Sequence, residues 1–562
     1  MHVKALLLVV PATLAIAFIG VRQRHLMDSS EGRVARVAQE MLQTGNWVVP
    51  HLNGEVRKEK PAFSSWCVAA TAMICGSDRV EPIHAFIPPG LAALGLVLLA
   101  YAWAARESRT LDHPTLFPVF AAVILAGTPG FLLQARSAEL DMLLAFFVGL
   151  TYWGFYTFRT SGCKAALLIG YVALALGIHT KAHVALILTV PPLVLWHIWE
   201  RNRLALTLPA AGAWRWHLIG IGLVLLLVVP YAITFIQQSD ITWADFNREG
   251  GTARFDESKT GHQEPFYWYF IQIPGWFLPW FLLLPLALIG ARNEPPDARS
   301  PLRRLCWLWF GVNLIVFSLL TAKQRHYAVP FFFPLAILIA DGVERFARSP
   351  GKLSRIGIGG IFLVLAVAVP ILAWPHRANS ALIDIYPQLT QSVIILTAVL
   401  SFLTAVVWML GWRIFATWWL VLVCIVGLRF LIIESKDIYE VSPKRFCDNV
   451  RRLVPDDAPL YDFGVAKGSV YRAQVLFYLG RRVTLPELPD DSEARLPEKH
   501  AAALTALFRD ARETIYVLTN RDVLSRVSLD YEVLTTQNDF LGHTKKDMYD
   551  VVLICNKSEP RP

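Results

Sequence analysis

A series of apolar segments, each about 20 residues long, limits the folds that this chain can adopt. A helical segment of this length matches the hydrocarbon thickness of a bilayer. About thirteen such segments occur, at 3–20, 83–105, 115–133, 141–158, 164–180, 182–198, 216–235, 268–290, 302–320, 327–343, 355–374, 390–411 and 413–433. The sequence therefore predicts an α-helical, polytopic membrane protein whose membrane domain covers residues 1–433.

The composition agrees with this prediction. Of the 562 residues, 55% are hydrophobic and only 17% are charged, which is more apolar surface than the core of one soluble domain requires. The formal net charge of +9 does not indicate nucleic-acid binding, because the basic residues concentrate between the apolar segments. The seven cysteines include no Cys-x-x-Cys pair, so the sequence signals neither a zinc site nor a disulfide framework.

The distribution of basic residues predicts the orientation of the chain. With a cytoplasmic N-terminus, the short cytoplasmic loops contain Arg106, Arg109, Arg159, Lys164, Arg201, Arg203, Arg215, Arg292, Arg299, Arg303, Arg304, Arg345, Arg348, Lys352, Arg355 and Arg413. The opposite short loops contain only Arg136, Lys181, Lys323, Arg325 and Arg377. This asymmetry follows the positive-inside rule and places three long polar segments on the outer side: 21–82, 236–266 and the tail from about 434.

The tail, residues 434–562, has the pattern of a soluble domain. Strand-like runs occur at 460–464, 514–519 and 551–555, and helical patterns occur at 444–454 and 498–510. We therefore predict a small C-terminal α/β domain on the outer side.

The first outer loop begins with an amphipathic pattern. Its apolar stripe consists of Val34, Val37, Ala38, Met41 and Leu42, and the opposite face consists of Arg33, Arg36, Gln39 and Glu40. This pattern is typical of a helix that lies in the membrane interface, and Gly45 is expected to end it. A second apolar segment, 61–74, is short for a span and is expected to lie at the interface as well.

The order of several motifs resembles that of a known family. RVARVAQEML, TGNWVVPHLNG and then EKP resemble the first outer loop of the ArnT-like glycosyltransferases, the bacterial relatives of the protein O-mannosyltransferases. ARSAELDMLLAFF is similar to their second outer loop, and HTKAH lies where they have Thr-Lys-Gly. GHQEPFYWY and FSLLTAKQRHYAVPFFFP resemble their large loop and their Ser-x-x-x-Lys-x-x-x-Tyr-x-x-Pro stretch. The likeness extends over about residues 1–345, with Ser30 and Val34 in place of the family's Asp and Tyr.

The resemblance implies the GT-C fold, whose members often carry a soluble outer domain at the C-terminus. It also implies an inverting glycosyltransferase of the bacterial inner membrane that takes a sugar from a polyprenyl phosphate such as undecaprenyl phosphate. No cofactor is expected beyond a possible divalent cation. The expected acceptor faces the outer side and is either lipid A or a protein.

Such a transfer sets chemical requirements that select candidate residues. Cations must neutralise the departing phosphate, and carboxylates must orient the nucleophile or stabilise positive charge at the anomeric carbon. The predicted catalytic carboxylates are Glu31, Asp141 and Asp28. The predicted donor-phosphate-binding residues are Lys60, Lys181, Lys323, Arg325 and Tyr327. By resemblance to the family, Glu59 and His262 are the expected ligands of a divalent cation.

Each group of candidates also has a structural interpretation. Asp28 and Glu31 have the spacing of a capping box, and Asp141 would interact favourably with a helix dipole. The basic residues could extend to the membrane interface as anchors. For the function, a transporter or flippase of a lipid-linked anion is the main alternative, although its charges should lie on broken helices at mid-membrane. An inactive, enzyme-like scaffold is a third alternative, motivated by Ser30.

The charge asymmetry makes a direct prediction about topology. Reporter tags inserted after Arg203 and after Arg299 should report the cytoplasm, and tags near Asn53, near Gly251 and at the C-terminus should report the outer side. A cytoplasmic C-terminus would contradict the odd number of spans and would leave the C-terminal domain on the wrong face.

Overall fold

The fold is given by a computed structural model. It describes residues 10–11, 13–14, 17–26, 29–58, 60–109, 116–201, 212–239, 264–278, 280–285, 288–289, 299–320, 323–348, 356, 359–364, 366–367, 387–411, 442–463, 472–485, 497–538 and 550–556. The chain divides into two compact units. We call residues 1–21, 58–64 and 86–433 the helical unit, and residues 22–57, 65–85 and 434–562 the mixed unit.

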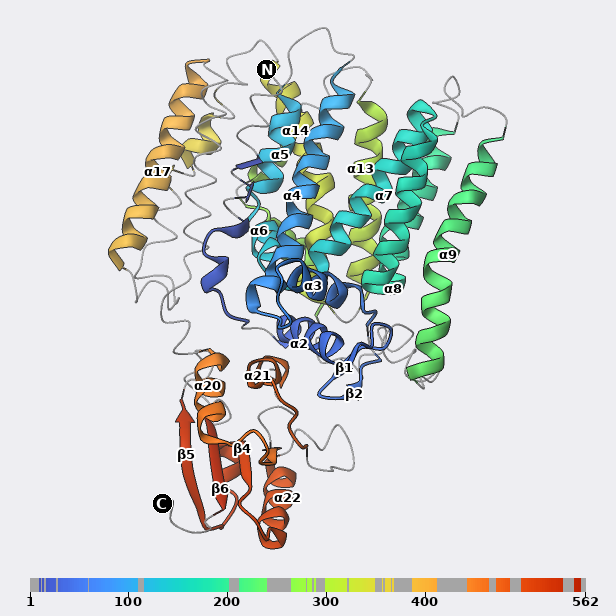
Figure 1. The fold of residues 1–562 in the computed structure, drawn as a ribbon. Coiled ribbons are helices and arrows are strands. Elements are labelled where there is room, and N and C mark those ends of the chain that lie inside the picture. The colour runs from blue at the N-terminus through green and yellow to red at the C-terminus, as the bar shows by residue number, and fades with distance from the viewer. Residues whose placement is uncertain are drawn as a thin grey trace. The chain divides into compact units, whose positions relative to one another are not determined.

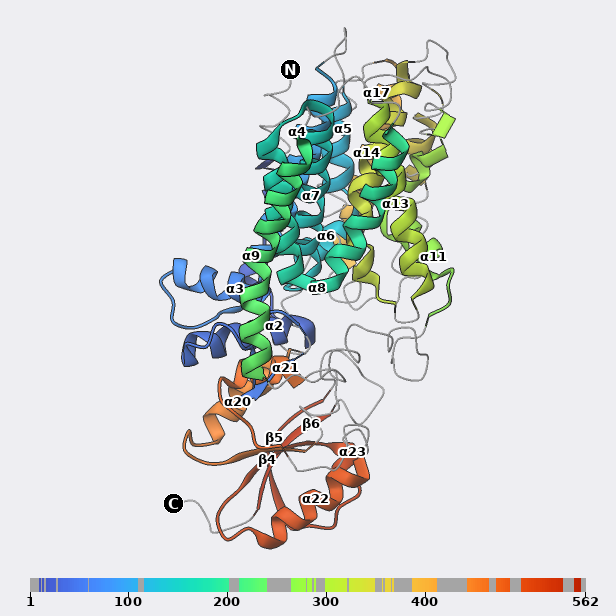
Figure 2. The same ribbon diagram turned by 90° about the vertical axis from the view of Figure 1, so that its right-hand side faces the viewer.

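Long helices dominate the helical unit. They are α4 (Pro82–Glu107), α5 (Phe117–Ala126), α6 (Pro129–Ala135), α7 (Asp141–Ser161), α8 (Lys164–Glu200), α9 (Ala213–Ser239), α11 (Trp268–Trp276), α13 (Ser300–Leu319), α14 (Val329–Arg348) and α17 (Pro387–Met409). Helices α4, α7, α13 and α14 run side by side (Figures 1 and 2). Helix α14 contacts α5, α7 and α13, so it lies in the interior of the bundle.

Aromatic side chains fill the space between four of these helices. Tyr152 of α7 stacks on Trp309 of α13, with the ring centroids 3.8 Å apart. Trp309 lies 5.4 Å from Phe333 of α14, and Trp103 of α4 lies 6.0 Å from the same ring. All four side chains are buried. Because aromatic rings bury large apolar areas in defined relative orientations, this cluster sets the spacing of the helices.

Five helices in the described residues are long and apolar enough to cross a membrane. The pair α5 and α6, bent by 63°, would make six. The sequence predicts about thirteen spans, and that higher count stays a prediction. Its ranges 3–20 and 355–374 fall partly outside the described residues, and 413–433 falls wholly outside them.

Helix α8 is broken where two predicted spans meet. The sequence predicts spans at 164–180 and 182–198, and the structure has one 37-residue element whose backbone is not helical at Lys181 (φ −148°, ψ 47°) and Ala182 (φ 31°, ψ −118°). A positive φ brings Cβ close to the backbone and therefore favours glycine. Ala182 therefore holds a strained conformation that a glycine would adopt without that cost.

The mixed unit combines part of the first predicted outer loop with C-terminal residues. The loop contributes α2 (Ser29–Thr44), the hairpin of β1 (His51–Leu52) and β2 (Glu55–Val56), and most of α3 (Phe63–Ile74). The C-terminal residues contribute α20 (Pro443–Leu453), α21 (Arg472–Leu479), α22 (Pro497–Asp510) and α23 (Arg521–Leu524), and the strands β3 (Leu460–Phe463), β4 (Tyr516–Asn520), β5 (Tyr531–Gln537) and β6 (Val551–Asn556).

The four C-terminal strands form one sheet in the order β3-β4-β6-β5. Strand β3 is parallel to β4, and the other pairs are antiparallel. Leu504 of α22 and Val523 of α23 pack with Val517 and Ile554 in a buried apolar cluster, and α22 covers one face of the sheet in Figure 2. Strands β3, β4 and β6 lie in the ranges that the sequence predicts, whereas β5 is an additional strand.

Much of the polar face of helix α2 is buried, since Arg36, Gln39 and Glu40 are each less than 10% exposed, and its predicted place in the membrane interface stays a prediction. Nε of Arg36 donates a hydrogen bond to Oε1 of Glu40 at 2.8 Å. The Glu40 carboxylate also accepts hydrogen bonds from the backbone N–H groups of Asn53 and Gly54, at 2.8 and 3.1 Å. Gln39 accepts another from the backbone of residue 80. Glu40 and Gln39 on the polar face therefore hold protein backbone groups in place.

A buried ionic network joins the start of α13 to the end of α14. Nη1 of Arg299 lies 2.7 Å from Oδ1 of Asp341 and 2.9 Å from Oε2 of Glu344. Nε of Arg345 lies 2.9 Å from the other oxygen of Asp341, and Arg303 lies 3.1 Å from it. Such buried charges stabilise a fold only when all of them are paired. Several basic residues that the sequence assigns to cytoplasmic loops are thus paired with carboxylates.

Replacing Ala182 with glycine should stabilise the protein, because glycine adopts a positive φ without steric cost. We expect Ala182→Gly to raise the free energy of unfolding by roughly 1 kcal/mol, which thermal unfolding in detergent would measure. Ala173→Gly, in the regular part of α8, is the matched control and should lower stability by roughly 0.5–1 kcal/mol. Equal losses in both variants would show that the break in α8 carries no strain.

Candidate functional site

The start of α7 and the break in α8 bring Asp141 and Lys181 together. Asp141 is the first residue of α7, where a carboxylate also interacts favourably with the helix dipole. Nζ of Lys181 lies 2.8 Å from Oδ1 of Asp141, and the two side chains are only 8% and 5% exposed. A buried pair of this geometry is stable only while both partners are present, because either charge alone would be costly to bury.

The short 3-10 turn η6 (Arg325–Ala328) adds two further side chains to this pair. Nε2 of His326 lies 3.7 Å from Oδ2 of Asp141, and Nδ1 lies 3.7 Å from Oε2 of Glu139. Nζ of Lys181 lies 4.1 Å from the centroid of the Tyr327 ring, a cation–π contact. We call Glu139, Asp141, Lys181, His326 and Tyr327 the α7–η6 cluster.

Lys60 adds positive charge to the α7–η6 cluster. It belongs to the segment 58–64 of the helical unit, and its ammonium interacts electrostatically with the Asp141 carboxylate. Of the five predicted phosphate-binding residues, the structure therefore gathers Lys60, Lys181 and Tyr327 around one carboxylate.

Lys323 and Arg325 take other positions. Nζ of Lys323 donates to the backbone oxygen of Glu264 at 2.8 Å and also to that of Leu320. Burial lowers the pKa of Lys323, although the nearby Glu264 carboxylate opposes the shift. The Arg325 side chain is exposed and has no hydrogen bond or ion pair with other described residues. Lys323 thus helps to fix the local backbone, and Arg325 lies outside the buried group.

The remaining candidates are Glu31, Asp28, Glu59 and His262. Glu31 belongs to the mixed unit, where it is buried and pairs with Arg24, Nη2 lying 3.1 Å from Oε1. Asp28 and the two expected metal ligands, Glu59 and His262, lie outside the described residues.

A divalent cation could be held by a different set of residues from the one that the sequence suggests. One ligand atom each from Glu139, Asp141 and His326 lie within 4.8 Å of one another. Two carboxylates and an imidazole are suitable ligands for a divalent metal. However, the Lys181 ammonium already contacts Asp141, and a cation bound there would have to share that carboxylate with it.

Glu139, His326 and Tyr269 are the members of this region that the sequence did not single out. Two of them lie beside selected residues, since Glu139 is two positions before Asp141 and His326 precedes Tyr327. The buried Tyr269 hydroxyl donates a hydrogen bond to the backbone oxygen of Gln324 at 3.1 Å, directly before η6. The Glu-x-Asp spacing could have identified Glu139 from the sequence. His326 could be identified only from the structure, because its contacts with Glu139 and Asp141 depend on how η6 packs against α7.

The α7–η6 cluster combines the properties that an anionic ligand with a nearby reacting centre requires. Two ammonium groups supply positive charge for an anion such as a phosphate. A carboxylate held in the same place by Lys181 and His326 can orient an incoming hydroxyl or stabilise a developing positive charge. Low exposure strengthens each of these interactions.

A double-mutant cycle on the buried pair should reveal strong coupling. Asp141→Asn should lower the free energy of unfolding by roughly 3 kcal/mol, because it leaves the Lys181 charge buried without its carboxylate. Lys181→Met should cost less, since Lys60 and His326 still face Asp141. The loss in the double variant should be smaller than the sum, as measured by thermal unfolding in detergent. Arg325→Ala, an exposed control, should change stability by less than about 0.5 kcal/mol, and additive losses would contradict the pairing.

Known proteins with similar sequences and folds are transferases. The family model described as dolichyl-phosphate-mannose-protein mannosyltransferase matches residues 88–243. Proteins from Shewanella sediminis and Erwinia tasmaniensis, each named undecaprenyl phosphate-alpha-4-amino-4-deoxy-L-arabinose arabinosyl transferase, are 28% identical to this chain. The first match spans 448 residues and 78% of both chains, and the second spans 445 residues and 76% of both chains.

The fold agrees with these matches. The crystal structure of ArnT from Cupriavidus metallidurans, bound to undecaprenyl phosphate, superimposes with a TM-score of 0.75 over 99% of both chains. The two sequences are only 19% identical, so this likeness speaks for the fold alone. In the order of its motifs and in its curated relatives the chain is thus similar to the ArnT-like glycosyltransferases, and its fold is similar to that of the ArnT crystal structure.

Proposed function

We propose that this protein is an inverting glycosyltransferase that moves a sugar from undecaprenyl phosphate to an acceptor on the outer face of the bacterial inner membrane. The names of its relatives make 4-amino-4-deoxy-L-arabinose the first sugar to test. The observation that carries the proposal is the convergence of Lys60 and Lys181 on the buried Asp141 carboxylate, in a chain that resembles these transferases over most of its length.

The α7–η6 cluster suits the charge changes of this reaction. The bond between the anomeric carbon and the phosphate oxygen breaks, and its electron pair leaves with undecaprenyl phosphate. The acceptor oxygen forms the new bond on the opposite face of the sugar. Because the departing phosphate gains negative charge, Lys60 and Lys181 bind it more strongly in the transition state than in the ground state. Asp141 would orient the acceptor or stabilise positive charge on the sugar ring.

We propose a phosphate of lipid A as the acceptor. An ionised phosphate oxygen is already a nucleophile and needs no general base. This acceptor therefore demands less of the start of α2, where Ser30 occupies the position of the family's usual Asp. A protein hydroxyl is the second candidate, because the family model that matches residues 88–243 describes protein mannosyltransferases.

Mass spectrometry of the cell envelope tests the sugar and the acceptor together. Lipid A from cells that carry the gene should contain a population heavier by one aminopentose, and cells without the gene should lack it. A glycan on envelope proteins that disappears with the gene would favour the protein acceptor instead. Identical lipid A and identical envelope proteins in both strains would contradict the proposed function.

Kinetics of a cation variant test the proposed phosphate site. A charge-assisted contact contributes roughly 1.5–3 kcal/mol, so Lys60→Ala should lower the specificity constant for a synthetic undecaprenyl-phosphate sugar by roughly ten- to a hundredfold. Lys164→Ala is the matched control, because Lys164 opens α8 and its Nζ lies over the Trp216 ring, 4.8 Å from the centroid. Its kinetics should equal those of the wild type, and equal kinetics for Lys60→Ala would place the phosphate elsewhere.

A further inference from the structure

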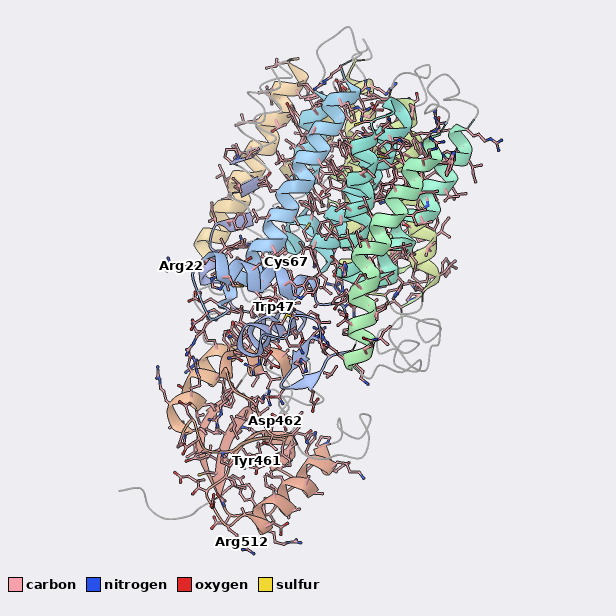
Figure 3. The ribbon with its side chains drawn as sticks, turned by 45° about the vertical axis from the view of Figure 1, so that its right-hand side comes forward. Arg22, Trp47, Cys67, Tyr461, Asp462 and Arg512 are labelled. Carbon is pink, nitrogen blue, oxygen red and sulfur yellow. The ribbon has the colours of Figure 1, made fainter. Side chains whose placement is uncertain are left out.

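The C-terminal residues of the mixed unit pack directly against the first predicted outer loop. Helices α20 and α21 lie between α2 and the sheet in both views of the ribbon (Figures 1 and 2). Helix α21 contacts α2 and α20. Figure 3 labels Trp47 and Cys67 in the loop segments, and Tyr461 and Asp462 on strand β3 of the sheet. Two of the contacts between these segments lie near the start of α2, where the predicted catalytic residue Glu31 lies.

Tyr478 of α21 holds the backbone just before α2. Its hydroxyl accepts a hydrogen bond of 2.7 Å from the backbone N–H of Leu26. Leu26 lies between Arg24 and Glu31, the two partners of a buried ion pair. Both Tyr478 and Leu26 are buried, so this hydrogen bond is shielded from water. Leu26 thus lies in the short segment that joins the two partners of this ion pair.

Gly32, the neighbour of Glu31, lies against the backbone of α21. A Cβ atom at position 32 would lie 2.5 Å from the backbone nitrogen of Gln474 and 2.8 Å from the carbonyl carbon of Ala473. Real Cβ atoms essentially never approach other atoms so closely. Glycine is therefore required for the observed approach of α2 to α21, one position after Glu31 in the sequence.

Asn53 forms a third link, at the tip of the β1–β2 hairpin. Its side chain donates to the backbone oxygen of Val483 at 2.9 Å and accepts from the backbone N–H of Val483 at 3.0 Å. The next residue, Thr484, exchanges backbone hydrogen bonds with β3, donating to the oxygen of Leu460 at 2.8 Å and accepting from the N–H of Asp462 at 3.0 Å. Continuous hydrogen bonding thus connects the C-terminal sheet to the hairpin.

His25 provides a fourth link, to the start of α20. Its Nδ1 lies 2.8 Å from Oγ of Ser442, the residue that caps α20. Burial and the nearby Lys444 ammonium lower the pKa of His25 to about 4. The ring is therefore neutral at neutral pH, and Nδ1 can serve as the acceptor or the donor of this hydrogen bond.

We propose that α21 and the segment to Thr484 form a positioning element for the acidic start of α2, with Tyr478 as its principal positioning residue. This inference rests on the proposed function and on the sequence prediction that Glu31 takes part in the transfer, because Tyr478 would act through Glu31. It goes beyond that function in giving the C-terminal region a part in catalysis. Without these links, the first turn of α2 would keep its helix but lose its fixed place.

Tyr478→Phe tests the proposal with the smallest possible change. It removes one hydroxyl and leaves the ring that packs 6.3 Å from His25. Loss of a hydrogen bond that positions a reacting group should lower kcat by roughly three- to tenfold, while KM for the undecaprenyl-phosphate sugar stays the same. Tyr461→Phe is the matched control, since Tyr461 lies on β3 in the same unit and its hydroxyl has no hydrogen bond with other described residues. Its kcat and KM should equal those of the wild type.

A coupling measurement separates positioning from a general loss of stability. If Tyr478 acts through Glu31, Tyr478→Phe should have little further effect on kcat in the Glu31→Gln background. Independent, multiplicative effects of the two substitutions would overturn the proposal, as would full activity of Glu31→Gln. If Glu31→Gln retains no measurable transfer, the test is the kinetics of Tyr478→Phe alone. A lower kcat with an unchanged KM supports the positioning role, and an unchanged kcat overturns it.

Gly32→Ala gives a second, larger perturbation of the same contact. It should lower kcat more than Tyr478→Phe does, because the new Cβ meets backbone atoms that cannot turn aside. Gly311→Ala is its control, since a Cβ at position 311 would meet nothing within 4 Å.

A wild-type protein without transferase activity would refute the proposed function. If the wild type is active but Tyr478→Phe has the same kcat as Tyr461→Phe, only the positioning role is refuted.

Discussion

Charges buried between apolar helices must be paired, and this requirement organises the helical unit. At one end of α7, Asp141 meets Lys181 from the break in α8. At the junction of α13 and α14, Arg299 and Arg345 surround Asp341. An unpaired member of either group would cost several kcal/mol, roughly 3–5 by comparison with other buried pairs. The ion pairs therefore fix which helix ends meet, and the aromatic cluster around Trp309 fixes how far apart the helices lie.

The Asp141–Lys181 pair also links backbone strain to the candidate site. Lys181 reaches Asp141 from a backbone that has left helical geometry, and the strained Ala182 follows it. Strained positions persist where the surrounding structure determines them, and they often occur at functional sites. In this chain the break presents an ammonium group to the start of α7. Under the proposed function, a donor phosphate would compete with Asp141 for that ammonium and leave the carboxylate to face the sugar or the acceptor.

The mixed unit shows that the C-terminal region and the first predicted outer loop are one structural body. Glu31 is close in sequence to Arg24, but Leu26, Gly32 and Asn53 are held by residues more than 400 positions later. The polar face of α2 is buried for the same reason, because Glu40 bonds the hairpin that Asn53 ties to the C-terminal residues.

The sequence by itself determined the helical membrane architecture, the resemblance to ArnT-like transferases and the selection of Asp141, Lys60, Lys181 and Tyr327. Apolar length, charge asymmetry and motif order are local properties, so they are readable along the chain. Tertiary structure alone decided that Lys323 bonds backbone oxygens and that His326 and Glu139 join Asp141. It also decided that Tyr478 holds Leu26. These contacts join residues far apart in sequence, and no periodicity or spacing encodes which side chains meet when separate helices pack.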